Sequence, residues 1–312
     1  MMKIVLVGQA PFGKDCLESI LQQGEQVVGV ITVPDDPKGR PNPVKDLALE
    51  KNIPVLQPPG RSPHRLKDTS VIPWVKDLKP DLFVLVFVTD FMPYEVIKMS
   101  TSGGINFHPS LLPKYRGGSA INWAVISGEK ETGVTVHYID EGVDTGDIIL
   151  QEKVTIEPED SVGSVYFNKL YPLGVSLTTQ AVKLIREGRA PRVPQEESQS
   201  SFQSVITEDD VKIDWNKAAE TIHNLIRGSN PSPGAHSLFR GEKIKVWEGE
   251  ISEVDSETRP GEVFELLEEK GFKVAAGRGS ILIKRVQLPG ESKITSQQFI
   301  EQVGLKPGEQ LN

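Results

Sequence analysis

The sequence predicts an α/β protein, with a Rossmann-like, doubly wound and mostly parallel sheet followed by a smaller β-barrel-like, or OB-like, domain. Over the first half of the chain, continuous apolar runs alternate with segments of helical spacing, which is typical of parallel strands joined by crossover helices. Pro, Gln, Glu and Ser then replace this periodicity, and short strand patterns separated by Gly and Pro follow. We therefore expect a first domain over 1–188, a linker over 189–204 and a β-rich domain over 205–312.

The strands of the first domain are expected where apolar, often β-branched residues run continuously, because strands covered by helices on both faces are apolar throughout. Helices are expected where apolar residues recur at helical spacing, and Pro172 should kink or divide the last of them. The expected strands are Lys3–Val7, Val27–Val33, Pro54–Leu56, Asp81–Val88, Gly104–His108 and Thr132–Tyr138. The expected helices are Asp15–Gln23, Asn42–Lys51, Val71–Leu78, Ser119–Ile126 and Asp160–Glu187.

The second domain should contain one helix and several short strands, because Gly and Pro interrupt its apolar segments at short intervals. The helix is expected over Ala218–Arg227, and the strands over Ile244–Trp247, Gly261–Leu266, Lys273–Ala276 and Ser280–Leu288. This pattern favours a small barrel or sandwich.

The composition excludes several classes of protein. The chain has 312 residues with 35 Lys and Arg against 43 Asp and Glu, and its net charge of -8 argues against non-specific nucleic-acid binding. The single cysteine, Cys16, cannot form an intramolecular disulfide or a cysteine-based zinc site. The longest apolar run, Leu82–Val88, is about a third of the roughly 20 residues that a membrane-spanning helix needs. A cytoplasmic protein is therefore expected.

The segment Gly8–Asp15, GQAPFGKD, has the glycine and lysine spacing of a phosphate-binding loop and lies between an expected strand and an expected helix. That motif needs a hydroxyl after its lysine to ligate magnesium, whereas Asp15 places a carboxylate there. We therefore favour a tight turn that opens a helix over a nucleotide-hydrolysing site.

Polar side chains suited to acid and base chemistry cluster in two later segments. Asn106 and His108 share one face of a short strand, because residues two apart in a strand point to the same side. Asp144 lies in the acidic loop Asp140–Asp147 after the next strand, and ligand sites in such folds gather at the carboxyl ends of strands. The spacing alone leaves open whether these residues form an active site or a structural hydrogen-bond network.

The segment Gly103–Gly118, GGINFHPSLLPKYRGG, together with DEGVDTGD at Asp140–Asp147, resembles the signature of the folate-dependent formyltransferase family. The resemblance covers nearly the whole chain, from VGQAPFG at Val7–Gly13 to the carboxy-terminal end that follows Lys245. It implies an enzyme of one-carbon metabolism that takes a formyl group from 10-formyltetrahydrofolate without a metal. It further implies that the catalytic residues are Asn106, His108 and Asp144.

The chemistry that the resemblance implies suits these side chains. Attack of an amine or of water on a formyl carbon makes a tetrahedral oxyanion, which preorganised donors such as Asn106 and His108 stabilise. His108, oriented by Asp144, titrates in the range needed to carry a proton from the nucleophile to the leaving nitrogen. The implied folate contacts are Asp90, Phe91 and Met92, then Ser110, Leu111, Leu112 and Pro113, and finally Asp140 and Gly142.

The remaining histidines and the cysteine are expected to play no chemical part. None of the four histidines has a ligand-like neighbour in the sequence, and we expect structural or surface roles for His64, His137, His223 and His236. Cys16 should be an inert, partly buried thiol, because nothing nearby completes a nucleophile and base pair.

The acceptor of the formyl group stays open between methionyl-tRNA, a small amine such as an amino sugar, and water. The opening GQAPFG and the stretches Phe107–Pro113 and Ser119–Trp123 resemble the hydrolase domain of 10-formyltetrahydrofolate dehydrogenase, which favours water or a small acceptor. The loop Asp35–Pro43 is also shorter and less basic than the tRNA-contacting loop of family members that act on tRNA. The carboxy-terminal end, Lys306–Leu311, resembles that of family members that act on methionyl-tRNA, and this architecture makes methionyl-tRNA the leading prediction. A tRNA partner requires a basic channel, to which we expect contributions from Lys38, Arg40, Lys114, Arg116 and Lys243.

Overall fold

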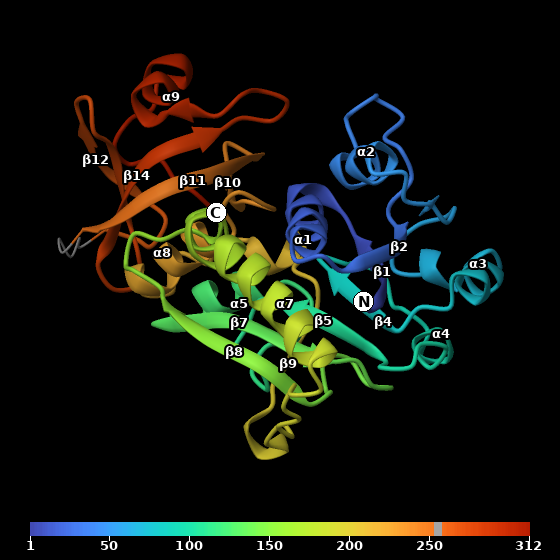
Figure 1. The fold of residues 1–312 in the computed structure, drawn as a ribbon. Helices are drawn as coiled ribbons and strands as arrows, with labels where there is room; N and C mark the ends of the chain where they lie inside the picture. The colour runs from blue at the N-terminus through green and yellow to red at the C-terminus, as the bar shows by residue number, and fades with distance from the viewer. Residues whose placement is uncertain (253–257) are drawn as a thin grey trace. The chain divides into compact units, whose positions relative to one another are not determined.

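A computed structural model describes residues 1–252 and 258–312 (Figure 1). The chain divides into two compact units that are built from interleaved segments. The first unit comprises Met1–Gly117, Gly133–Val154 and Asn168–Phe202, and the second comprises Gly118–Thr132, Thr155–Phe167 and Gln203–Asn312. The sequence predicts two continuous domains, over 1–188 and 205–312, and not interleaved segments. That division stays a prediction.

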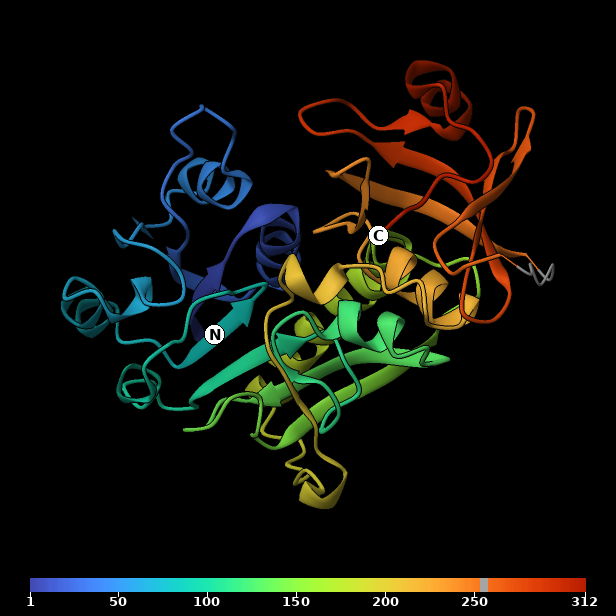
Figure 2. The ribbon, with the colours of Figure 1, turned by 180° about the vertical axis from the view of Figure 1, so that it is seen from behind.

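A seven-stranded sheet forms the centre of the first unit and is seen from opposite sides in Figures 1 and 2. Its strands are β1 (Lys3–Gly8), β2 (Gln26–Ile31), β3 (Val55–Leu56), β4 (Leu82–Val86), β5 (Gly104–His108), β7 (Glu131–Tyr138) and β8 (Ile148–Thr155). They follow the order β3-β2-β1-β4-β5-β7-β8, with parallel pairing from β3 to β5 and antiparallel pairing between β5 and β7. The prediction of a mostly parallel, Rossmann-like sheet is confirmed.

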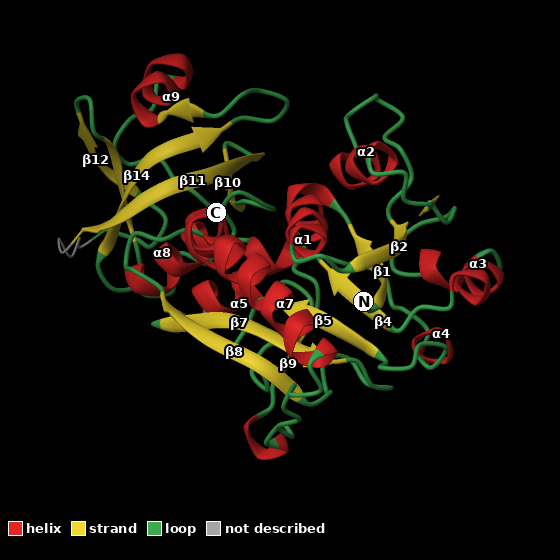
Figure 3. Ribbon diagram, in the orientation of Figure 1, coloured by secondary structure: helices red, strands yellow, loops and turns green. Residues whose placement is uncertain are grey.

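Helices connect the parallel strands of this sheet (Figure 3). The connecting helices are α1 (Ala10–Gln22), α2 (Pro43–Glu50), α3 (Val71–Leu78) and α4 (Tyr94–Ile97), whereas α7 (Tyr171–Arg186) follows β8, the last strand of the sheet in chain order. Helix α7 packs closely on β5, because a Cβ atom on Gly174 would lie only 2.4 Å from the Phe107 ring. The centroids of the Phe12 ring of α1 and the Phe107 ring of β5 lie 4.4 Å apart, so an aromatic contact holds α1 against β5.

The helical stretch expected over Asp160–Glu187 is divided into α6 (Val162–Val165), a π-helical turn η2 (Tyr166–Leu170) and α7. Pro172 lies in the first turn of α7, where its missing backbone N–H costs no helical hydrogen bond. The predicted division of this stretch is therefore confirmed. The helix expected to begin at Asp15 begins at Ala10 instead, directly after β1.

Antiparallel strands dominate the second unit, as the sequence predicts. They are β10 (Ala235–Phe239), β11 (Glu242–Ser252), β12 (Val263–Leu267), β13 (Gly271–Ala275), β14 (Ser280–Gln287) and β15 (Ile294–Thr295), accompanied by α5 (Ala120–Ile126), α8 (Ala219–Gly228) and α9 (Ser296–Val303). The sheet order is β10-β11-β14-β13-β12, with β15 beside β14. Near the chain end Leu311 bridges to Phe239 of one edge strand and Gln310 to Glu262 at the other, which gives a barrel-like closure.

Short elements complete both units. They are β6 (Arg116–Gly117), which pairs with β9 (Phe202–Gln203), and the 3-10 helices η1 (Arg65–Lys67), η3 (Glu197–Gln199) and η4 (Asp209–Val211). The segment expected to be a linker is bound to the first unit by backbone hydrogen bonds in both directions between Ile148 and Val193. Among the residues that the structure describes, no helix combines the length and apolarity needed to cross a membrane.

Candidate active site

Three of the predicted site residues meet beside β5, which carries two of them, while the third lies in the loop after β7. Asn106 Nδ2 donates a hydrogen bond to Asp144 Oδ1 over 3.2 Å, and His108 Nδ1 lies 3.4 Å from Asp144 Oδ2. Asn106 and His108 lie on one face of β5, as expected from their spacing, and the loop after β7 brings Asp144 to them. A carboxylate, an imidazole and an amide therefore form one contiguous cluster.

His108 is held between two acceptors. Its Nε2 bonds to the Tyr115 carbonyl oxygen at 2.7 Å, so in the neutral ring the proton resides on Nε2 and Nδ1 is left bare toward Asp144. Burial lowers the pKa of His108 below its ordinary value, against the opposing effects of the Asp144 carboxylate and the Tyr115 carbonyl. The site thus contains a neutral imidazole whose free nitrogen can take up a proton beside a carboxylate.

Asp144 is fixed by its backbone and its neighbours. Its φ of 55° lies in the left-handed region, and its Oδ2 accepts a hydrogen bond from the Gly117 N–H at 2.9 Å. Burial alone raises a carboxyl pKa, but two neighbouring imidazoles and this N–H outweigh it, so the pKa of Asp144 lies well below its usual range. The carboxylate remains charged wherever the protein is folded near neutral pH.

His137 is a fourth member of the cluster. Its Nε2 lies 3.3 Å from Asn106 Nδ2 and 3.4 Å from Asp144 Oδ1, while its Nδ1 bonds to the Tyr138 carbonyl oxygen at 2.7 Å. The expectation that His137 lacks a ligand-like neighbour is wrong. The antiparallel register pairs Asn106 with His137 across β5 and β7, and no signal in a single sequence reveals which strands become neighbours.

The amide of Asn106 is fully engaged in this arrangement. Because His137 carries its proton on Nδ1, its bare Nε2 accepts from one hydrogen of the Asn106 amide, while Asp144 accepts from the other. Asn106 therefore presents its oxygen to a ligand, and it has to release one partner before it donates to an oxyanion. Of the two contacts, the one with His137 is the longer.

The predicted folate contacts at Ser110, Leu111, Leu112 and Pro113 form a loop anchored from β7 and β8. Thr135 Oγ1 donates to the Ser110 carbonyl oxygen at 2.6 Å, and Gln151 Nε2 donates to the Leu112 carbonyl oxygen at 2.9 Å. Ser110 is fully buried, with its hydroxyl donating to the Lys114 carbonyl oxygen. Leu111 and Pro113 remain partly exposed, so these two offer the apolar surface of the loop.

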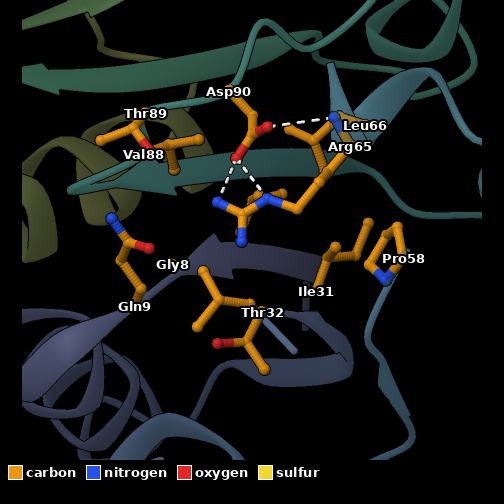
Figure 4. A pocket seen from close by; sticks show the side chains of 12 residues that line it. Gly8, Gln9, Ile31, Thr32, Pro58, Arg65, Leu66, Val88, Thr89 and Asp90 are labelled. Carbon is orange, nitrogen blue, oxygen red and sulfur yellow. Dashed lines mark hydrogen bonds and ion pairs between the residues drawn. The ribbon is translucent and has the colours of Figure 1, made fainter. Parts of the chain in front are cut away.

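The predicted contacts Asp90, Phe91 and Met92 follow β4, the neighbour of β5. A pocket opens at the carboxyl ends of β1, β2 and β4, where Arg65 donates to Asp90 Oδ2 through Nε at 3.0 Å and through Nη2 at 2.7 Å (Figure 4). Asp90 is thus committed to an ion pair inside the first unit. Phe91 is 52% exposed, and Met92 packs against the core beside β4.

The remaining folate contacts, Asp140 and Gly142, organise the loop that carries Asp144. Asp140 Oδ1 accepts from the Gly142 N–H at 3.0 Å and from the Thr145 hydroxyl at 2.6 Å. A Cβ atom on Gly142 would lie 2.1 Å from that hydroxyl oxygen, so any larger residue would displace the Thr145 side chain from Asp140. The prediction places both residues against folate, whereas the structure shows what they do for the loop itself.

Two further expectations need correction. Arg116 does not offer its charge to an RNA, because its guanidinium is buried against Gln195 and bonds in bidentate fashion to Glu197. Cys16 is fully buried rather than partly buried, and burial raises the pKa of its thiol, which agrees with an inert role. Lys38, Arg40, Lys114 and Lys243 are exposed, and their contribution to a basic channel stays a prediction.

No group of three or more His, Cys, Asp or Glu side chains is arranged to hold a metal ion within residues 1–252 and 258–312. The expectation that the reaction needs no metal stays a prediction.

The fold and the cluster together define an α/β enzyme with an acid–base centre at the carboxyl ends of its strands. The chain belongs to the formyl transferase family: the family model described as Formyl transferase matches residues 2–181, and the model described as Formyl transferase, C-terminal domain, matches residues 205–304. The family expected from the sequence is therefore confirmed, and the protein is a formyltransferase.

Named relatives and solved structures agree with this assignment. Methionyl-tRNA formyltransferase of Alkaliphilus oremlandii is 38% identical over 304 residues, which cover 96% of each chain. An N-formyltransferase of Helicobacter canadensis, solved with folinic acid and dTDP-3-aminofucose, superposes with a TM-score of 0.68 at 24% identity and covers 91% of this chain and 99% of its own. HypX of Aquifex aeolicus superposes with a TM-score of 0.68 at 20% identity; 98% of this chain spans 48% of HypX.

Proposed function

We propose that the protein transfers the formyl group of 10-formyltetrahydrofolate to the amino group of methionyl-tRNA. The similarity to a methionyl-tRNA formyltransferase over 96% of both chains is the observation that carries the choice of acceptor. The family assignment and the His108–Asp144 pair support the reaction class. A cytoplasmic location follows from the proposal, because translation supplies the charged tRNA there.

The residues beside the cluster fit a folate donor. Folate carries planar aromatic rings, and the exposed ring of Phe91 together with the partly exposed Leu111 and Pro113 offers apolar surface near the strand ends. The donor supplies a formyl carbon on nitrogen 10 that an amine can attack. Asp90, Met92, Ser110, Leu112, Asp140 and Gly142 complete the proposed folate-binding set.

His108 is the proposed proton carrier. A C–N bond forms between the acceptor amine and the formyl carbon, and the amine must lose a proton before the bond from that carbon to nitrogen 10 breaks. The bare Nδ1 of His108 takes this proton, because the imidazolium then donates both to Asp144 and to the Tyr115 carbonyl. The same proton is returned to nitrogen 10, so charges and protons balance over the reaction.

Asn106 is proposed to orient the substrates. In the structure its oxygen is free to accept from the attacking amine, while its two amide hydrogens serve His137 and Asp144. When the tetrahedral oxyanion develops, release from His137 allows Asn106 to donate to the new charge. No step of this sequence requires a metal.

The proposal is tested by measuring tetrahydrofolate release from 10-formyltetrahydrofolate in parallel with charged initiator methionyl-tRNA, with a panel of amino sugars and without an acceptor. We expect acceleration by the tRNA alone. Turnover without an acceptor would make the protein a hydrolase, and acceleration by an amino sugar would make it a small-amine formyltransferase. Either result would overturn methionyl-tRNA as the acceptor.

A further inference from the structure

The segment 193–203 lies in the stretch that the sequence predicts to be a linker. In the structure its side chains form hydrogen bonds both with the loop that contains Asp144 and with the segment that contains Arg116. We propose that Gln195 and Arg116 are positioning residues of the formyl transfer, and that together they fix His108 against Asp144. The proposal rests on the proposed function of that site and names two residues outside the Asn106, His108 and Asp144 cluster.

Gln195 uses its whole side-chain amide to join two loops. Its Nε2 donates to the Asp144 carbonyl oxygen and to the Gly146 carbonyl oxygen, each at 2.8 Å. Its Oε1 accepts from Arg116 Nε at 3.1 Å and from Arg116 Nη2 at 2.8 Å. Two donors and two lone pairs are therefore all satisfied, which fixes the amide in one orientation.

Arg116 is held equally firmly. Its Nη1 and Nη2 bond to the two carboxylate oxygens of Glu197 at 3.0 and 2.7 Å, and its backbone N–H donates to the Ser201 carbonyl oxygen at 2.9 Å. Only 6% of the residue is exposed. A planar guanidinium in a bidentate contact resists rotation, so Arg116 provides a rigid anchor for the loop that contains it.

The two neighbours of Arg116 in sequence make the contacts that matter for the chemistry. The Tyr115 carbonyl oxygen holds His108 Nε2, and the Gly117 N–H holds Asp144 Oδ2. Tyr115 has a left-handed φ of 59°, a conformation that a non-glycine residue keeps only when its surroundings impose it. The Ser201 hydroxyl, which accepts from the Tyr115 N–H at 2.8 Å, belongs to the same 193–203 segment.

These contacts form one connected hydrogen-bond network around His108 and Asp144. Gln195 holds the backbone of Asp144, and through Arg116 it holds the loop whose carbonyl and N–H orient the side chains of His108 and Asp144. Loss of the Gln195 amide therefore removes hydrogen bonds from the loop of Asp144 and from the segment of Arg116 at the same time. A displacement of about 1 Å at a reacting group costs on the order of 100-fold in rate, so the expected loss of turnover is about 10- to 100-fold.

The test compares Gln195→Ala with Gln199→Ala in the full-length protein. Gln199 is a matched control, because it is the same residue type in the same segment and its side chain is exposed. We expect Gln195→Ala to lower kcat about 10- to 100-fold while the Kd for 10-formyltetrahydrofolate stays within about twofold. Gln199→Ala should keep both constants.

A second readout does not depend on the acceptor. The pKa of His108, followed through its imidazole resonance by NMR, should move up toward the ordinary histidine value in Gln195→Ala, because burial is the largest cause of its lowering and the loosened loops admit water. It should stay unchanged in Gln199→Ala. If the wild-type protein fails to formylate methionyl-tRNA, the proposed function falls while this measurement still decides the role of Gln195.

Gln195→Glu covers the case in which Gln195→Ala does not fold. The glutamate keeps its contact with Arg116 but cannot donate to the two carbonyl oxygens, so we expect the same loss of kcat and the same movement of the His108 pKa. A kcat within twofold of wild type, or a fall in kcat with folate binding weakened in parallel and the His108 pKa unmoved, would overturn the positioning role.

Discussion

The segments Gly8–Asp15 and Asn106–Tyr115 each include the carboxyl end of a parallel strand of the same sheet, β1 and β5 respectively, yet they differ in what their polar residues do. After β1, Lys14 pairs with Glu18 at 3.4 Å, and Asp15 accepts from the Tyr171 hydroxyl at 2.6 Å. Each of these polar groups has a partner on a nearby helix. In β5, by contrast, the Asn106 and His108 side chains both contact Asp144.

Packing also explains the two glycines of Gly8–Asp15. A Cβ atom on Gly8 would lie 2.7 Å from Val86 Cγ2, and one on Gly13 would lie 3.0 Å from Val44 Cγ2. Close packing of β1 against β4 at Gly8, and of α1 against α2 at Gly13, therefore accounts for the glycine spacing that resembles a phosphate-binding loop. The comparison teaches that motif spacing alone is weaker support for a site than polar groups that converge without a structural need.

A large effect is expected from Asp144. Asp144→Ala removes the carboxylate that stabilises the protonated His108, so turnover should fall by about 100- to 1,000-fold while folate binding changes far less. Steady-state kinetics combined with equilibrium folate binding measures both. Asp144→Asn keeps the shape without the charge and should lose activity similarly. Near wild-type turnover in both variants would remove Asp144 from the mechanism.

A smaller effect is expected from His137, the member of the cluster that the sequence did not reveal. His137→Ala removes one of the two partners that orient the Asn106 amide before transfer, and the loss of that orientation should lower kcat by about 10- to 100-fold. The matched control is His64→Ala, because His64 is exposed in the same unit. Equal activity of the two variants would return His137 to a purely structural role.

The pH profile sharpens the comparison further. His108 has to be neutral to accept a proton, and its pKa is lowered, so kcat/KM should stay level as the pH falls through the ordinary histidine range and decline only below it. Asp144 does not contribute a decline near neutral pH, because its pKa is held well below the usual carboxyl range. A decline centred at or above the ordinary histidine value would contradict the assignment of His108 as the base.

The smallest effect on activity is expected in the segment Gly8–Asp15, at a glycine of α1. Gly13→Ala places a methyl group against Val44 and the Gly8 backbone, and the clash should outweigh the gain in helix propensity by about 1 kcal/mol. Thermal unfolding should therefore begin earlier while kcat stays within twofold of wild type. A loss of kcat as large as that of His137→Ala would mean that this loop takes part in the chemistry.

Much of the fold could be predicted because its strands are buried on both faces. The continuous apolar run in β4 is typical of a strand that is buried on both faces. The next strand was expected over Gly104–His108, and β5 has these bounds in the structure. Strand β8 was not predicted, because half of its residues are exposed and its apolar run, Ile148–Leu150, is short. The antiparallel turn of β7 against β5 depends on tertiary packing, which local patterns do not encode.

The same contrast applies to the candidate site. The i, i+2 spacing predicted the common face of Asn106 and His108 from local geometry alone. His137 enters the cluster through cross-strand pairing, and Gln195 through a fold-back of a segment rich in Pro, Gln, Glu and Ser. Such a composition is typical of linkers, and the sequence therefore predicted a linker. In the structure this segment forms hydrogen bonds with the residues that position the site.

The central claim is that the chemistry takes place after β5 and not after β1. Its most direct test is the single-turnover rate of formyl transfer from 10-formyltetrahydrofolate to methionyl-tRNA in His108→Ala and Lys14→Ala, with folate binding measured for both. We predict a loss of about three orders of magnitude for His108→Ala with folate still bound, and an unchanged rate for Lys14→Ala. Retained transfer in His108→Ala would contradict the whole site assignment.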